Sequence, residues 1–182
     1  RRFRQDFTKA LHLIREGAIG QVEELQGRCP NLYDWGTHWF DMFFFLLGDI
    51  QASWVLGQAD LTDARQVFDV PVDSRAVSRV HFESGQTAVL LTDRCQPHQI
   101  GIRVRGTEGI MEIFPSAPQP FRMLRSGGSG HWEDPPLALP GTTMDHAKAV
   151  QASLAHALEC AGSGVEPQIG RASCRERVCH RV

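Results

Sequence analysis

The sequence lacks a C-x-x-C pair, although it contains five cysteines. These are Cys29, Cys95, Cys160, Cys174 and Cys179. An odd number without paired spacing argues against a disulfide framework and a structural zinc site, and it predicts a reducing, cytoplasmic setting. No apolar run reaches the roughly 18 residues that a membrane span needs, and the net charge of −2 gives no reason to expect nucleic acid or a membrane as partner.

The sequence also lacks an initiator methionine and a signal peptide at its start, Arg1-Arg2-Phe3. We therefore expect it to begin midway through a longer protein. Residues 170–182 are rich in arginine and show no apolar period, as translated adaptor or vector sequence does; a genuine basic tail is the alternative. We expect one domain over 1–169 and a non-native or disordered tail over 170–182.

The most apolar stretch is Asn31 to Asp49, and it contains Asp34, His38 and Asp41 as a D-x-x-x-H-x-x-D array. On a helix, these spacings place the three polar side chains on one face. A second set has the spacing of a core-facing stripe, and Gly48 is placed to end the helix. This set is Phe40, Phe43, Phe44 and Leu47.

Other segments predict helices over 4–16 and 142–161 and a loop over 58–74. We expect strands over 21–28, 50–57, 75–82, 86–93, 99–105, 110–114 and 121–124. In the last helix, Thr142 with Asp145 resembles a capping box, and Gly162 is the expected end. Its predicted inner stripe is Ala147, Val150, Leu154, Ala157 and Leu158. Hairpin-joined strands predict an α+β fold, with a large, mostly antiparallel sheet and helices packed on one face.

Several motifs occur in one order: L-I-R-E-G-A-I-G-Q-V, D-x-G-x-H-x-x-D, F-x-S-G, V-x-G-T-E-G and A-L-x-x-x-G-S-G-V-E-P. Together they resemble the C-terminal domain of the Gfo/Idh/MocA oxidoreductases. The resemblance implies a preceding Rossmann domain that binds NAD or NADP, and an open sheet face that packs against another subunit. The sequence has no G-x-G-x-x-G and no E-K-P motif, so no cofactor-binding residue is expected within it. The approach to the array, Cys29 to Tyr33, is shorter than is usual in the family, which predicts a reshaped substrate pocket.

By this resemblance, Asp34 and His38 match the family's catalytic aspartate and histidine. Oxidation of a secondary alcohol removes a hydride from carbon and a proton from oxygen, and imidazole is a base of suitable pKa. Asp34 could orient the ring. Asp41 stays open between a role in binding substrate and a structural role.

Each of these residues also has an ordinary explanation. Asp34 could cap the helix, and a lone helical histidine is often structural. Trp35 and Trp39 could form a stacking platform for a sugar, although packing is the commoner use. Asn31 and Tyr33 lie beside the array in the sequence and are candidate substrate contacts. Arg2 could approach the cofactor, with a surface ion pair as the alternative.

We therefore expect a fragment that supplies the substrate-binding part of an NAD(P)-dependent dehydrogenase of a sugar, cyclitol or related polyol. We expect it to be inactive alone, to form a homo-oligomer through the sheet, and to hold no metal. A non-catalytic ligand-binding or dimerisation module is the alternative. A hydrolase with Asp34 and Asp41 as paired carboxylates is a third possibility, which only the spacing supports.

Overall fold

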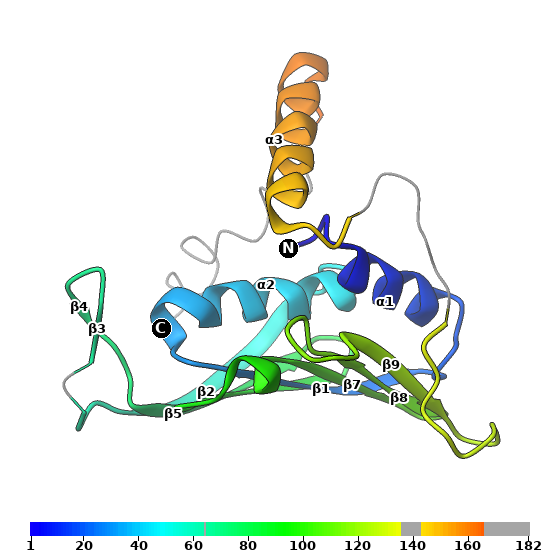
Figure 1. Cartoon of the computed structure of the whole chain (residues 1–182), viewed down its shortest axis with the longest axis horizontal. Helices are drawn as coiled ribbons and strands as arrows, with labels where there is room; N and C mark the ends of the chain where they lie inside the picture. Colours follow the sequence, from blue (N-terminus) through cyan, green and yellow to red (C-terminus); the bar gives the residue numbers. More distant parts are fainter. Residues whose placement is uncertain (64, 136–142, 166–182) are drawn as a thin grey trace.

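A seven-stranded sheet is the centre of the computed structural model, which describes residues 1–63, 65–135 and 143–165 (Figure 1). Its strand order is β2-β5-β6-β1-β7-β8-β9, and every neighbouring pair is antiparallel except β1 and β6. The strands are β1 (Val22–Cys29), β2 (Ala52–Asp60), β5 (Arg75–Phe82), β6 (Thr87–Thr92), β7 (Gly101–Gly106), β8 (Gly109–Ile113) and β9 (Phe121–Arg125). The predicted α+β class is confirmed.

Side-chain alternation explains how the sheet separates its two faces. Along β5, Ala76, Ser78, Val80 and Phe82 are buried, whereas the residues between them face outward. The turn to β6 contains Gly85 with φ 93°, so the predicted hairpin is confirmed. Residues 58–74 are not all loop, because β2 runs to Asp60 and a small hairpin forms from β3 (Gln66–Val67) and β4 (Val70–Pro71).

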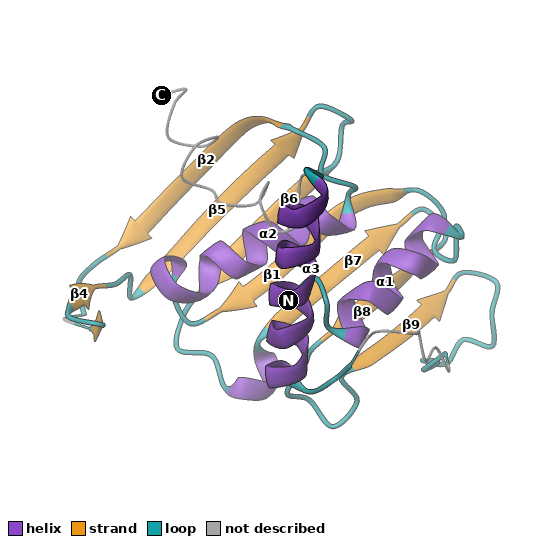
Figure 2. Ribbon diagram, turned by 90° about the horizontal axis from the view of Figure 1, so that it is seen from above, coloured by secondary structure: helices purple, strands orange, loops and turns teal. Residues whose placement is uncertain are grey.

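Two helices, α1 (Gln5–Arg15) and α2 (Thr37–Leu46), cover one face of the sheet (Figures 1 and 2). A π-helical turn, η1 (Leu32–Gly36), precedes α2, and a short 3-10 turn, η2 (Pro97–Gln99), precedes β7. On the other sheet face, no helix lies among the residues that the structure describes (Figure 1). We call it the open face.

The side of α2 that faces the sheet differs from the predicted stripe. Of the predicted stripe, Phe43 and Leu47 are buried, whereas Phe40 and Phe44 are only half-buried. The other buried side chains of this segment are Trp39, Met42, Phe45 and Leu46. The reason lies in β1, where a Cβ at Gly27 would come within 2.8 Å of Phe43 and 3.0 Å of Trp39. Because the glycine leaves this space, both rings pack directly onto the strand. Gly48 has φ 78°, as expected for a helix end.

The last helix, α3 (His146–Ser163), projects away from the sheet (Figure 1). Its cap is Asp145, whose carboxylate accepts hydrogen bonds from the N–H groups of Ala147 and Lys148. The predicted inner stripe is wrong, since Val150, Leu154 and Leu158 are exposed on a helix that does not lie on the sheet. Thr142 lies outside the described residues. The predicted end at Gly162 is also wrong, because the left-handed residue is Gly164 with φ 69°.

Residues 170–182, with the expected tail, lie outside the described part of the chain. Within the described residues, no helix combines the length and the apolar character needed to cross a membrane.

Candidate functional site

The candidate site is built where the chain leaves β1 and enters α2. The Asn31 side chain is buried, and its Oδ1 accepts a hydrogen bond of 2.7 Å from the N–H of Asp34. The predicted cap at Asp34 is therefore wrong, because Asn31 fills that role and leaves the Asp34 carboxylate free for another. The Asn31 side chain is 2% exposed, and its role as a substrate contact stays a prediction.

Asp34 and His38 do not share one regular helix. Asp34 is half-buried in the π-helical turn, and His38 is in the first turn of α2. Among the described residues, His38 has no hydrogen-bond partner, so the expected orienting bond from Asp34 is not formed. The two groups still interact electrostatically, because Asp34 acts to raise the pKa of His38.

The surroundings nevertheless lower the pKa of His38 below its ordinary value of 6.5. Burial of the ring is the largest cause, and the positive charge of Arg1 is the next. Asp34 and Asp41 oppose these effects but do not outweigh them. At neutral pH the ring is therefore uncharged and can accept a proton.

Arg1 lies beside the candidate site, although no motif in the sequence singled it out. Its guanidinium lies 5.0 Å from the ring centre of Trp35 and 4.8 Å from that of Trp39. The two indoles meet edge-on, with centres 5.9 Å apart and an angle of 89° between their planes. Trp39 is fully buried, so the pair packs together and forms no exposed stacking platform. The guanidinium and both indoles line a cavity of about 350 Å³.

Asp41 points away from this group and binds Arg2. The Arg2 guanidinium lies 2.8 Å from a carboxylate oxygen of Asp41 and 2.8 Å from one of Asp49. Burial alone would lower the pKa of Arg2, but its hydrogen bonds to Asp49 and Asp41 raise it overall. Arg2 is 5% exposed, so the ion pair expected at the surface is instead buried. This ion pair fastens the start of the chain to α2 and favours the structural role of Asp41.

The remaining predicted contacts lie at the rim. Tyr33 is half exposed, and Trp35 is half-buried beside Arg1. Cys29 is buried at the end of β1, and burial raises the pKa of its thiol to about 12, so it is no nucleophile at neutral pH. In the described part of the chain, no group of three histidine, cysteine or acidic side chains could hold a metal ion.

Taken together, these features define an α+β domain that presents an uncharged imidazole and a carboxylate on the helix side of a large sheet. The sequence model of the GFO/IDH/MocA C-terminal domain matches residues 30–112, which include Asp34, His38 and Asp41. This match agrees with the resemblance to the Gfo/Idh/MocA C-terminal domain that the motifs predicted. No curated protein sequence matches the chain significantly.

Solved structures of oxidoreductases have the same fold. One, from Agrobacterium radiobacter in complex with NAD+, L-tartaric acid and magnesium, has 17% identity and a TM-score of 0.66 over 94% of this chain and 56% of that one. An inositol dehydrogenase homolog from Azotobacter vinelandii, complexed with NADH and myo-inositol, has 13% identity and a TM-score of 0.66 over 94% and 57%. An oxidoreductase from Sinorhizobium meliloti has 18% identity and a TM-score of 0.68 over 92% and 53%. The chain thus spans about half the length of the structures that it matches.

Proposed function

We propose that this chain supplies the substrate side of the active site of an NAD(P)-dependent dehydrogenase that acts on a sugar, cyclitol or related polyol. The observation that carries the proposal is the solvent-reaching His38, whose lowered pKa favours the uncharged ring. Asp34 lies close enough to affect the charge of that ring. The Azotobacter homolog binds myo-inositol, which is a cyclitol, and this supports the proposed substrate class.

In the proposed reaction, His38 accepts the proton of the substrate hydroxyl whose carbon is oxidised. The ring then becomes an imidazolium. Asp34 stabilises this cation, because its carboxylate raises the pKa of the ring. A carboxylate near the base therefore lowers the cost of the charge that appears during proton transfer.

NAD or NADP supplies the hydride acceptor when bound. The link from β1 into the site, Pro30-Asn31, contains no glycine and does not fit the glycine-rich loop that cradles a dinucleotide phosphate. We therefore assign the cofactor phosphates to residues outside this chain, and we derive no step through them.

The open face offers a surface for the proposed homo-oligomer. Trp54, Leu56, Val77 and Leu91, on β2, β5 and β6, are all at least 40% exposed there. We expect Leu56→Asp to lower the mass of the oligomer in light scattering, since a charge would be buried at the contact. Leu61→Asp, at an equally exposed site just beyond β2, is the control. A wild-type mass of one chain would contradict this proposal.

The experiment that tests the function compares the intact protein, expressed from its whole reading frame, with the 182-residue chain. Both are assayed with a panel of polyols and with NAD+ or NADP+ by absorbance of the reduced cofactor. We expect turnover by the intact protein and none by the chain alone. Turnover by the chain alone would contradict the need for outside residues. An intact protein that binds polyols without turnover would favour the non-catalytic module.

A further inference from the structure

A buried carboxylate from another part of the chain holds the turn that contains Asp34. Asp73 lies two residues after β4 and is 4% exposed. One of its oxygens accepts a hydrogen bond of 2.7 Å from the N–H of Leu32, the first residue of η1. The other oxygen accepts a hydrogen bond from the hydroxyl of Thr92, the last residue of β6. We call these three residues the Asp73 bridge.

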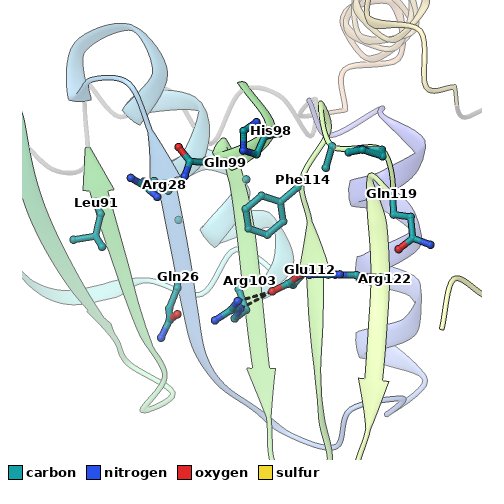
Figure 3. Close-up of a pocket in the computed structure, with 14 residues that line it drawn as sticks. Gln26, Arg28, Leu91, His98, Gln99, Arg103, Glu112, Phe114, Gln119 and Arg122 are labelled. Carbon is teal, nitrogen blue, oxygen red and sulfur yellow. Dashed lines mark hydrogen bonds and ion pairs between the residues drawn. The ribbon is translucent and has the colours of Figure 1, made fainter. Parts of the chain in front are cut away.

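The Asp73 bridge lies on the helix side of the sheet, as the candidate site does. Along β6, Leu91 lines a hollow of the open face (Figure 3), so its neighbour Thr92 points to the other face, where it is 3% exposed. In the register of the parallel pair, Thr92 is opposite Cys29, the last residue of β1. The two strands therefore end at the same edge of the sheet. The bridge ties η1 to the edge from which the chain enters it.

Two buried side chains hold η1 in place, one from nearby and one from far along the chain. Asn31 caps the turn from the preceding residue. Asp73 is 41 residues away from Leu32 in the sequence. In the part of the chain that the structure describes, no other side chain from outside residues 31–37 forms a hydrogen bond with η1. The hydrogen-bonded link between this turn and the sheet therefore depends on the Asp73 bridge.

The bridge requires an acceptor for two donors. The Leu32 N–H belongs to the start of a helical turn, where such groups have no partner within the turn. A carboxylate offers two acceptor oxygens, whereas an asparagine amide offers one. Among the described residues, no arginine, lysine or histidine forms an ion pair with Asp73. A buried charge without such a partner is costly, so stability alone does not account for a carboxylate here.

We propose that Asp73 is a positioning residue for Asp34 and His38. By holding Leu32 at the end of β6, the bridge fixes the direction in which η1 leaves the sheet. Asp34 lies two residues beyond Leu32, and His38 follows in the first turn of α2. A displacement of the turn moves both side chains, and a misplacement of about 1 Å can lower a rate about 100-fold. This inference rests on the proposed dehydrogenase function, since it concerns the same two residues.

The first measurement compares kcat for polyol oxidation in the intact protein, expressed from its whole reading frame. We expect Asp73→Ala to lower kcat about tenfold to 100-fold. Asp73→Asn should recover most of this loss, because its amide oxygen can accept the Leu32 hydrogen bond and its amide group can donate to the Thr92 hydroxyl. Asp63→Ala is the matched control, since the carboxylate of Asp63 binds Arg94 at 2.8 Å and not η1. Its kcat should stay within about twofold of the wild type.

The second measurement follows His38 itself by NMR and needs no turnover. The intact protein contains isotope-labelled histidine, and the His38 signal is the one that is missing in His38→Ala. Burial is the largest cause of the lowered pKa of His38, so a displaced turn in Asp73→Ala should expose the ring and raise this pKa toward 6.5. Arg1, Asp34 and Asp41, the charged side chains that act on the ring, stay the same in the variant. A role confined to stability would change the fraction of folded protein and leave the pKa of the folded form unaltered.

A second pair of variants keeps the test decisive if Asp73→Ala does not fold. Thr92→Val removes the hydroxyl and keeps the shape of the side chain, whereas Thr92→Ser keeps the hydroxyl. We expect Thr92→Val to raise the pKa of His38 and Thr92→Ser to leave it unchanged. An unaltered pKa of His38 in Asp73→Ala or in Thr92→Val, or equal kcat in Asp73→Ala and Asp63→Ala, would overturn the proposal. A wild-type protein without turnover would contradict the proposed function, and the titration of His38 would still decide whether Asp73 positions the ring.

Discussion

Replacement of His38 by alanine in the intact protein is expected to lower kcat for polyol oxidation about 100-fold to 10,000-fold, the range for loss of a general base. The imidazole is the group expected to take the hydroxyl proton, because its lowered pKa keeps the ring uncharged at neutral pH. The substrate KM should change less than kcat, since the lost interaction develops during proton transfer.

His12→Ala is the matched control for this variant. His12 lies on α1, outside the array; it is partly exposed, and its Nδ1 lies 3.1 Å from a carboxylate oxygen of Glu16. Its replacement should leave kcat within about twofold, because surface changes away from the site have small effects. Equal losses in the two variants would show that His38 is not the base.

The pH dependence of the same reaction provides a second readout of His38. Because burial and Arg1 lower its pKa, the ring stays uncharged as pH falls to 6.5 and becomes protonated only below that value. The acid limb of kcat/KM is therefore expected below pH 6.5, and it should disappear in His38→Ala. An acid limb that persists in the variant would belong to another group.

The strands could be predicted from the sequence because their signals are local. Alternation from Arg75 to Phe82 and the glycine turn at Gly85 need no knowledge of distant segments, and both are confirmed. Asp34 and His38 are four residues apart, and this spacing alone predicts that the two side chains lie near each other. Their catalytic role stays a prediction until activity is measured.

The side of α2 that faces the sheet could not be predicted, because it depends on Gly27 of β1. Periodicity correctly placed Phe43 in the core, but the space over Gly27 admits Trp39 beside it, and Phe40 and Phe44 stay half-buried. Whether Trp39 forms a stacking platform for a sugar or packs in the core depended on the same space over Gly27.

Ion pairs between residues far apart in the sequence could not be predicted either. Arg2 and Asp41 are 39 residues apart, and only the fold shows that the carboxylate is committed to that guanidinium. On the open face, Arg103 of β7 and Arg122 of β9 both bind Glu112 of β8. This grouping depends on strand order, because the three residues lie on neighbouring strands.

Trp39→Ala is expected to have the largest effect on stability, with a loss of about 3–5 kcal/mol in the free energy of unfolding. Trp39 is fully buried, contacts the Phe7 ring edge-on with centres 6.1 Å apart, and donates a hydrogen bond of 2.8 Å to the Arg28 carbonyl oxygen. Alanine would leave a cavity above Gly27 and an unpaired acceptor. Domains of this kind are stable by about 5–15 kcal/mol, so much of the margin would disappear.

Trp54→Ala separates this packing effect from the loss of any tryptophan. Trp54 is 45% exposed on the edge strand β2 and stacks on His81, so its loss should cost about 1 kcal/mol or less. Urea unfolding followed by circular dichroism measures both variants. If Trp39 served as a stacking platform for a sugar, Trp39→Ala would instead raise the substrate KM and leave the unfolding midpoint unchanged. A fall in the midpoint for Trp39→Ala alone is therefore the result that places this indole in the core beneath the site.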